Sequence, residues 1–148
     1  PIVINIKVET DPELNPPNDK TVSIIITQLF ESKGIHNSDL LFIFGNDELL
    51  NNLKKEFFNQ NHFTDVIAFR MNDYTEENVE GEVYISLPRV EENAKKFNQP
   101  FHKELGRLII HGGLHLLGYK DKTDEEKAEM TRQENQYLDQ VNWNQLYG

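Results

Sequence analysis

The sequence contains no cysteine, and this absence excludes several kinds of chemistry at once. A chain without thiols forms no disulfides, holds no zinc through thiolate ligands and has no cysteine nucleophile. It does not need disulfides for stability, because 148 residues can bury roughly 70% of their extended surface in one folded domain. We therefore expect residues 1–148 to form a single domain with its own hydrophobic core.

Long apolar runs are also missing. The stretch from Ile2 to Ile6 is short and partly alternating, which indicates a strand rather than the apolar region of a secretory signal. No run approaches the ~20 apolar residues that a transmembrane helix needs. Together with the lack of cysteine, which suits a reducing compartment, this predicts a cytoplasmic protein without a membrane segment.

Positive charge is scarce. Fifteen Lys and Arg stand against 25 Asp and Glu, for a net charge of −10. Nucleic-acid-binding proteins typically carry a basic stripe, so the composition argues against a broad electrostatic grip on RNA or DNA. Two interpretations stay open for the basic residues in the middle of the chain: a local patch, or scattered surface charges. These residues are Lys54, Lys55, Arg70, Arg89, Lys95, Lys96, Lys103 and Arg107.

The most informative segment is HGGLHLLGYKD at positions 111–121. Residues four apart share one face of a helix, so His111 and His115 can reach the same ion. Gly118 can adopt the left-handed conformation that ends a helix, and the chain can then return with Asp121 as a third ligand. Two imidazoles and one carboxylate leave a coordination position open, as in catalytic zinc sites. We predict one divalent ion at this site, with zinc preferred and iron, nickel or manganese also suited.

The same ligand spacing occurs in the metzincin proteases. Those enzymes carry a glutamate directly after the first histidine as the general base, and that position is Gly112 here. A peptide hydrolase would therefore need its base elsewhere, and Glu82 is the nearest candidate in the sequence.

Short strands and helices alternate along the chain, which predicts a mixed α/β or α+β fold around a small sheet. Strands are expected at 2–8, 40–44, 64–69 and 82–86. Helices are expected from Asp19 to about 33, from Asp47 to about 57, from Pro88 to about 97, after Pro100, and from Thr123 to about 139. Gly112 and Gly113 weaken the helix after Pro100 by ~1 kcal/mol each, and we attribute them to the close approach of a strand.

Three blocks in a fixed order resemble the YbeY family of bacterial metal-dependent endoribonucleases, which act in ribosomal RNA maturation and ribosome quality control. The first is the histidine segment, which matches the family signature through Tyr119 and then has Asp121 in place of its third histidine. The others are TDVIAF at 64–69 and GEVYIS at 81–86, and the likeness extends from about Leu53 to Met130.

The resemblance implies a four-stranded sheet covered mainly by helices, and a catalytic ion held by His111, His115 and Asp121. It implies a ribosomal RNA precursor as substrate and ribosome or ribosome-assembly proteins as partners. Thr64, Asp65 and Ser86 become candidates for contacts with the substrate or the ligands. They fit equally well as strand residues whose polar groups are satisfied by the backbone.

One position departs from the family. An arginine that usually lies six residues before the threonine of the Thr-Asp strand is Phe58 here, and phenylalanine cannot hold a phosphate by paired hydrogen bonds. Arg70 and His62, on either side of that strand, could supply the missing charge. Two alternatives to a ribonuclease therefore stay open: a metal-dependent hydrolase of another substrate such as a peptide, and a largely non-catalytic ribosome-assembly factor.

Overall fold

The computed structural model describes residues 2–60 and 64–148, which contain four strands and five α-helices. The elements are β1 (Val3–Thr10), α1 (Asp19–Ser32), β2 (Asn37–Gly45), α2 (Asp47–Phe58), β3 (Val66–Arg70), β4 (Val79–Ser86), α3 (Leu87–Lys96), α4 (Phe101–Leu116), α5 (Asp124–Leu138) and the 3-10 turn η1 (Trp143–Leu146).

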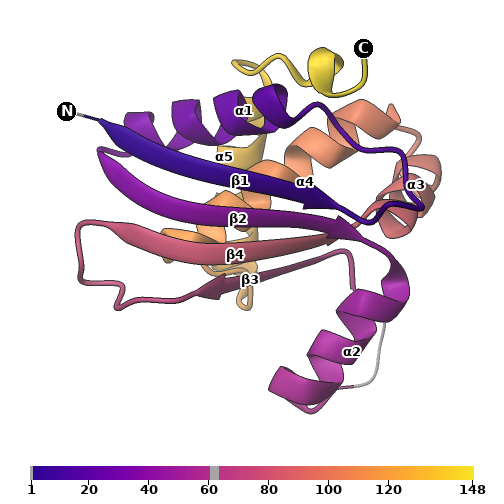
Figure 1. Ribbon diagram of the computed structural model, residues 1–148, viewed down its shortest axis with the longest axis horizontal. Helices are drawn as coiled ribbons and strands as arrows, with labels where there is room; N and C mark the ends of the chain where they lie inside the picture. Colours follow the sequence, from indigo (N-terminus) through magenta and orange to yellow (C-terminus); the bar gives the residue numbers. More distant parts are fainter. Residues whose placement is uncertain (1, 61–63) are drawn as a thin grey trace.

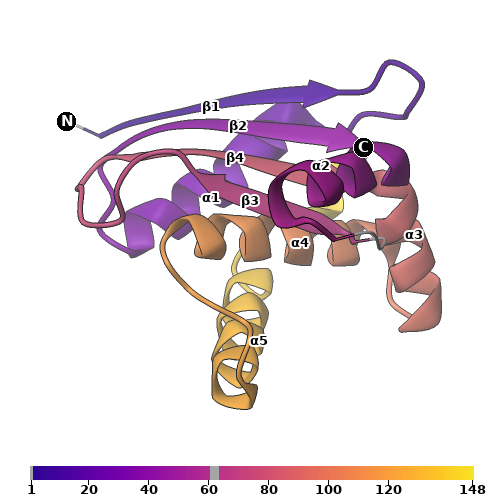
Figure 2. The same cartoon turned by 90° about the horizontal axis from the view of Figure 1, so that it is seen from below.

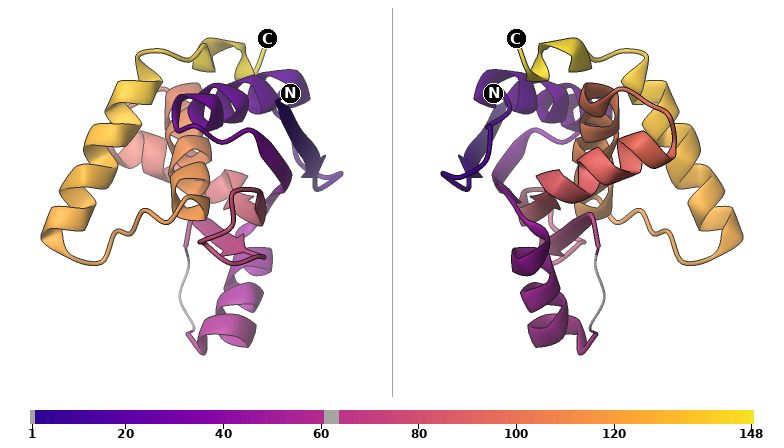
Figure 3. Two further views of the ribbon diagram at one scale, coloured as in Figure 1. Left: turned by 90° about the vertical axis from the view of Figure 1, so that its left-hand side faces the viewer. Right: turned by 90° about the vertical axis from the view of Figure 1, so that its right-hand side faces the viewer.

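The strands form one mixed sheet in the order β1-β2-β4-β3 (Figure 1). β2 pairs in parallel with both β1 and β4, whereas β3 is antiparallel to β4. This confirms the expected α/β domain with a mixed four-stranded sheet. β3 forms one edge of this sheet, and α2 lies beyond that edge in Figures 1 and 3.

Among the described helices, α1, α4 and α5 are layered on one face of the sheet, and α2 packs against Phe69 at the β3 edge. In Figure 2, α1 and α4 lie along one side of the strands, and α5 lies farther out, against α4. The strand sequences explain this arrangement, because successive side chains point to opposite faces. In β2, for example, Leu40, Phe42 and Phe44 are buried, whereas Leu41 and Ile43 between them are only partly buried and Asp39 is exposed. The opposite face of the sheet therefore carries the more polar set of side chains.

α4 is the central helix of the fold, and it lies between the sheet and α5 (Figure 3). It begins directly after Pro100, as predicted, and Leu105, Ile109, Ile110 and Leu114 are fully buried along it. A helix enclosed on several sides holds its polar residues in fixed positions, which matters for the two histidines near its C-terminal end.

Local sequence signals set most element ends. Thr123 and Glu126 form a capping box at the expected start of α5, and Gly34 takes a left-handed conformation after α1. Three strand starts differ from expectation by two or three residues: β2 begins at Asn37 rather than Leu40, β3 at Val66 rather than Thr64, and β4 at Val79 rather than Glu82. Pairing with β2, which joins Ser38 to Val79, extends β4 into a segment whose polar sequence indicated a loop.

No helix in the described ranges is both long enough and apolar enough to cross a membrane.

Candidate metal centre and cleft

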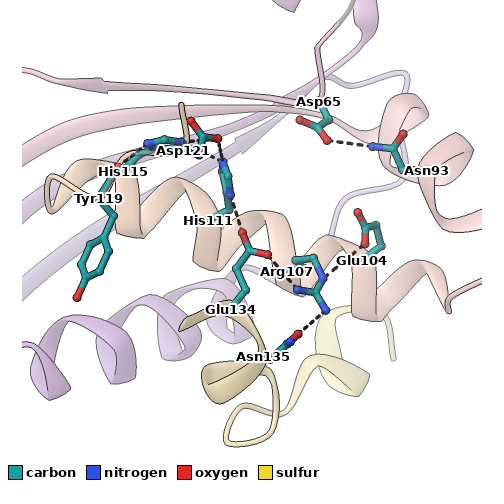
Figure 4. Close-up of polar contacts among 10 residues, drawn as sticks. All are labelled: Asp65, Asn93, Glu104, Arg107, His111, His115, Tyr119, Asp121, Glu134 and Asn135. Atoms are coloured by element: carbon teal, nitrogen blue, oxygen red, sulfur yellow. Dashed lines mark hydrogen bonds and ion pairs between the residues drawn. The ribbon is translucent and has the colours of Figure 1, made fainter. Parts of the chain in front are cut away.

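The last turns of α4 bring the two predicted histidine ligands together. The Nε2 atoms of His111 and His115 lie 2.9 Å apart, and their rings meet nearly at right angles. The helix ends at Leu116, and Gly118 follows with a φ of +98°, so the predicted left-handed turn is confirmed. The chain then returns and places Asp121 Oδ2 3.4 Å from both Nε2 atoms (Figure 4).

These three side chains fit a divalent ion. Tetrahedral zinc with bonds of about 2.0–2.2 Å requires its ligand atoms to lie about 3.3–3.5 Å from one another. The two distances from Asp121 meet this requirement, and the histidine pair is slightly closer. One ligand atom from each of the three residues lies within 4.8 Å of the others. A small opening of the histidine pair is all that an ion would require.

Hydrogen bonds fix the orientation of both imidazoles. His111 Nδ1 lies 2.6 Å from Glu134 Oε2 and donates to that carboxylate, while His115 Nδ1 lies 2.8 Å from the carbonyl oxygen of Tyr119 and donates to it. In each ring the Nε2 atom is therefore the one directed at the common point. Such partners commonly hold histidine ligands in the metal-binding tautomer and orientation.

The electrostatics of the metal-free site are those of a strongly coupled cluster. Burial lowers the pKa of His111, but hydrogen bonds with Asp121 and Glu134 outweigh this effect and raise that pKa to about 9. Burial and the neighbouring His111 charge lower the pKa of His115. The hydrogen bond with His111 lowers the pKa of Asp121 to about 2. A proton on His111 thus occupies the cluster in the absence of metal, and metal binding would release it.

Glu134 is a partner of the candidate ligand His111 that the sequence analysis missed. It lies on α5 with only 7% of its surface exposed, and its second carboxylate oxygen accepts a 2.9 Å bond from Arg107 Nη1. Arg107 also lies near Glu104 and donates to Asn135, which completes a polar network behind His111 (Figure 4). One sequence pattern could have identified Glu134: it lies four residues after Met130 and three before Tyr137, on the buried face of α5.

The paired glycines of α4 have two different neighbours. A Cβ atom on Gly112 would lie 2.6 Å from Val83 Cγ1 on β4, so the expected approach of a strand is correct at this position. A Cβ atom on Gly113 would instead meet Leu29 and Ile26 of helix α1, the nearest atom being 2.8 Å away. The strand explanation is therefore wrong for Gly113, because α4 is packed between the sheet and a helix at this level.

The three candidate metal ligands lie in a cleft of about 950 Å³. One wall of the cleft is formed by the end of α4 and the returning loop, including Lys120 and Lys122. The other wall is formed by Lys54 and Phe58 of α2 together with Thr64, Asp65 and β3 residues up to Ala68. Lys54 is the one member of the eight-residue basic set among the described lining residues, so that set does not form a patch at the cleft.

The predicted substrate contacts fall into two groups. Thr64 and Asp65 line the cleft, and Asp65 Oδ2 accepts a 2.9 Å bond from Asn93. Burial raises the pKa of Asp65. Ser86, by contrast, is fully buried outside the cleft, where its hydroxyl donates to Asp47 and accepts from the first turn of α3. His62 lies outside the described residues.

Arg70 is directed away from the cleft. Its guanidinium donates to the carbonyl oxygen of Leu116 at the end of α4 and to carbonyls of Asp73 and Asn78 in the β3–β4 loop. It also contacts the ring of Tyr74. These bonds tie the loop to the end of the metal-bearing helix, and Arg70 is not among the described residues that line the cleft.

Comparisons with known proteins agree with this geometry. A profile of the family described as "Endoribonuclease YbeY" matches residues 5–142. The "Endoribonuclease YbeY" of Karelsulcia muelleri is 43% identical over 100 residues, which cover 68% of this chain and 70% of the relative. That of Flavobacterium johnsoniae is 36% identical over 137 residues, which cover 92% of this chain and 95% of the relative.

A solved structure is similar as well. The solution structure of TM1509 from Thermotoga maritima superimposes with a TM-score of 0.63 at 29% identity, over 92% of this chain and 88% of that one. The family profile spans the sheet, the histidine pair, Asp121 and Glu134 together. The chain belongs to the YbeY endoribonuclease family.

Proposed function

We propose that this protein hydrolyses RNA at a metal ion held by His111, His115 and Asp121, and that its substrate is a ribosomal RNA precursor. The observation that carries the proposal is the convergence of these three ligand atoms in a cleft, with the histidines already oriented by Glu134 and the Tyr119 carbonyl. Zinc is the ion we propose. When bound, it would act as a Lewis acid on a phosphoryl oxygen and lower the pKa of water towards ~7.

The chain's own groups would position the RNA around that ion. Lys54, Lys120 and Lys122 line the cleft and can offset the charge of the phosphates. Thr64 and Asp65, on the opposite wall, are placed to bind a ribose 2′-hydroxyl, the group that distinguishes RNA from DNA. We further propose that the protein acts in the cytoplasm, with the ribosome or its assembly proteins as partners.

Hydrolysis of peptides is the second candidate, and one observation favours it. β3 is an edge strand and lines the cleft, so an extended peptide could pair with it beside the ion. The base that such an enzyme needs is in the wrong place, however. Val83 faces α4, so its neighbour Glu82 lies on the opposite face of the sheet, where it accepts a bond from Tyr84.

Metal analysis and cleavage assays test the proposal. Purified protein should contain about one zinc per chain and should cleave single-stranded or structured ribosomal RNA fragments. Activity should disappear with a chelator and return when zinc is added. A protein that binds zinc but leaves RNA intact would instead support the non-catalytic assembly factor, and cleavage of a casein-derived peptide would support the peptidase.

A further inference from the structure

Phe58 belongs to an aromatic cluster that remains partly exposed beside the cleft. Its ring stacks on Phe69 of β3 at a centroid distance of 5.9 Å, and the ring of Phe57 meets Phe69 edge-on. Phe57 and Phe58 keep 58% and 43% of their surface exposed. Phe69 thus supports Phe58 from the sheet, while a large part of the Phe58 side chain remains accessible.

Phe58 also lines the metal cleft, and it does so together with a cation. Lys54 lies one turn earlier on α2, and its Nζ atom is 4.6 Å from the centre of the Phe58 ring. Both residues line the same cleft as His111, His115 and Asp121. A flat apolar surface and a positive charge therefore occur together on the wall opposite the candidate ligands. Because the Lys54 ammonium lies over the Phe58 ring, a flat ligand that stacks on this ring would displace it sideways.

The charge of the cleft indicates which ligand suits this pair. The chain carries a net charge of −10, yet its cleft is lined by Lys54, Lys120 and Lys122 against the carboxylates of Asp65 and Asp121. Adding a divalent ion makes the cleft positive overall. A ligand that is both polyanionic and rich in flat rings is a nucleic-acid strand, and its ring faces are accessible only where the bases are unstacked.

We propose that Phe58 is a stacking platform for one nucleobase of a single-stranded segment, and that Lys54 binds the adjoining phosphate. The inference rests on the proposed function and makes it more specific, because it assigns the recognition of one unpaired base to Phe58. Proteins that hold single strands commonly combine these two contacts, an aromatic face and a cationic groove. Stacking on Phe58 would replace the paired hydrogen bonds that an arginine at position 58 could donate to a phosphate.

Binding of a fluorescein-labelled octamer of deoxyadenosine, followed by anisotropy on the zinc-loaded protein, tests the platform without relying on cleavage. Phe58→Ala should weaken binding by at least about fivefold, the lower end for the loss of one stacked base. The penalty should vanish with an octamer of abasic residues that keeps the same phosphates. Lys54→Gln should weaken binding of both octamers.

Phe97→Ala is the matched control. Phe97 is 57% exposed and has Lys96 Nζ 5.7 Å from its ring centre, but it is not among the described residues that line the cleft. This variant should bind the octamer like the parent. Phe58→Leu keeps an apolar contact with Phe69 and should bind weakly, whereas Phe58→Trp should bind at the parental level or better.

The platform is refuted if Phe58→Ala binds like Phe97→Ala, if its penalty persists on the abasic octamer, or if the Leu and Trp variants bind equally. The Leu and Trp pair decides the question even if the Ala variant fails to fold. If the parent protein does not cleave RNA but Phe58→Ala still binds the octamer more weakly than the parent, the platform is retained and only the proposed catalysis is refuted.

Discussion

The two walls of the cleft draw their side chains from the sequence differently. Their comparison shows which features of a site local sequence patterns can predict. On the α4 wall, three ligands come from positions 111–121, and the structure brings all three together. On the facing wall, α2, the segment before β3 and β3 itself contribute side chains from positions 54–68. There, some predicted contacts line the cleft and others lie away from it.

Backbone geometry explains the difference. A helix fixes the relative directions of residues four apart, and one left-handed glycine fixes the return of the chain, so the ligand set follows from spacing alone. The facing wall depends on which acceptors surround each side chain after folding. Arg70 has the right charge in the right region, but the Leu116 carbonyl and the β3–β4 loop already hold it.

The largest effect should come from removing a ligand on the α4 wall. His115→Ala leaves two ligand residues, and the purified variant should contain almost no zinc and should cleave RNA at background level. His102→Ala is the control, since His102 lies on the same helix but stacks on Tyr147 away from the metal ligands. Cleavage by the His115 variant at the parental rate would contradict both the site and the nuclease assignment.

Lowering the pH should weaken zinc binding strongly. His111 has a pKa of about 9 in the metal-free protein, and only the neutral imidazole binds metal, so below this pKa each ion must displace a proton. Zinc affinity should therefore fall by about tenfold for each pH unit between 8 and 6. A competition titration with a chromophoric chelator measures this slope, and a flat profile would exclude His111 as a ligand.

Glu134→Gln tests the support behind the histidine. Loss of the carboxylate should reduce zinc affinity by about 10–100-fold, the usual range for partners of histidine ligands. It should also lower the pKa of His111 in the metal-free protein, which an NMR titration can follow. Glu129→Gln, on the exposed side of the same helix, should change neither quantity. An unchanged His111 pKa would show that Glu134 acts only in packing.

Glu134 also shows which kind of contact could not be predicted from the sequence. The spacing of the candidate ligands, the start of α5 at Thr123, and the presence of four strands and five helices follow from short-range patterns, and the structure contains them. Glu134 lies 23 residues from His111, and no local rule joins them. Their contact exists because α5 packs across α4, a tertiary event that no local pattern specifies.

The sheet shows the same limit of prediction from local sequence patterns. Its mixed class could be predicted, but the stacking of α1, α4 and α5 on one face could not, because that depends on where each connecting helix crosses. Thr64 and Asp65 precede β3 instead of belonging to it, so they line the cleft as part of a connection rather than as ladder residues. Ser86 ends β4 and caps α3, and this double position leaves it buried away from the cleft.

Gly118→Val, on the α4 wall, should lower zinc affinity moderately. A β-branched residue at φ +98° is strained by ~1–3 kcal/mol, so the turn that delivers Asp121 should shift and zinc affinity should fall. Gly34→Val provides a matched strain at φ +78° after α1, away from the site. Both variants should lose similar stability in urea unfolding, but only the Gly118 variant should lose zinc affinity. Equal zinc affinity in the two would show that the turn does not control Asp121.

The smallest change should come from Phe58→Arg on the facing wall. A charge-assisted contact with phosphate contributes ~1.5–3 kcal/mol, while the loss of a stacked base costs ~1–3 kcal/mol, so the two nearly cancel on ordinary single-stranded RNA. Cleavage of such RNA should therefore change only a few-fold. Two other measurements separate the contributions.

Binding by the arginine variant should depend more steeply on salt, because one added phosphate contact changes the slope of log affinity against log salt by about 0.7 on a single strand. Abasic oligomers have no base to stack, so the variant should bind them about tenfold more tightly than the parent does. A large gain on ordinary RNA with no gain on abasic oligomers would mean that Phe58 had been an obstacle rather than a platform. In that case the facing wall would bind RNA through its charge alone. Stacking of an unpaired base would then not explain how the cleft selects its substrate.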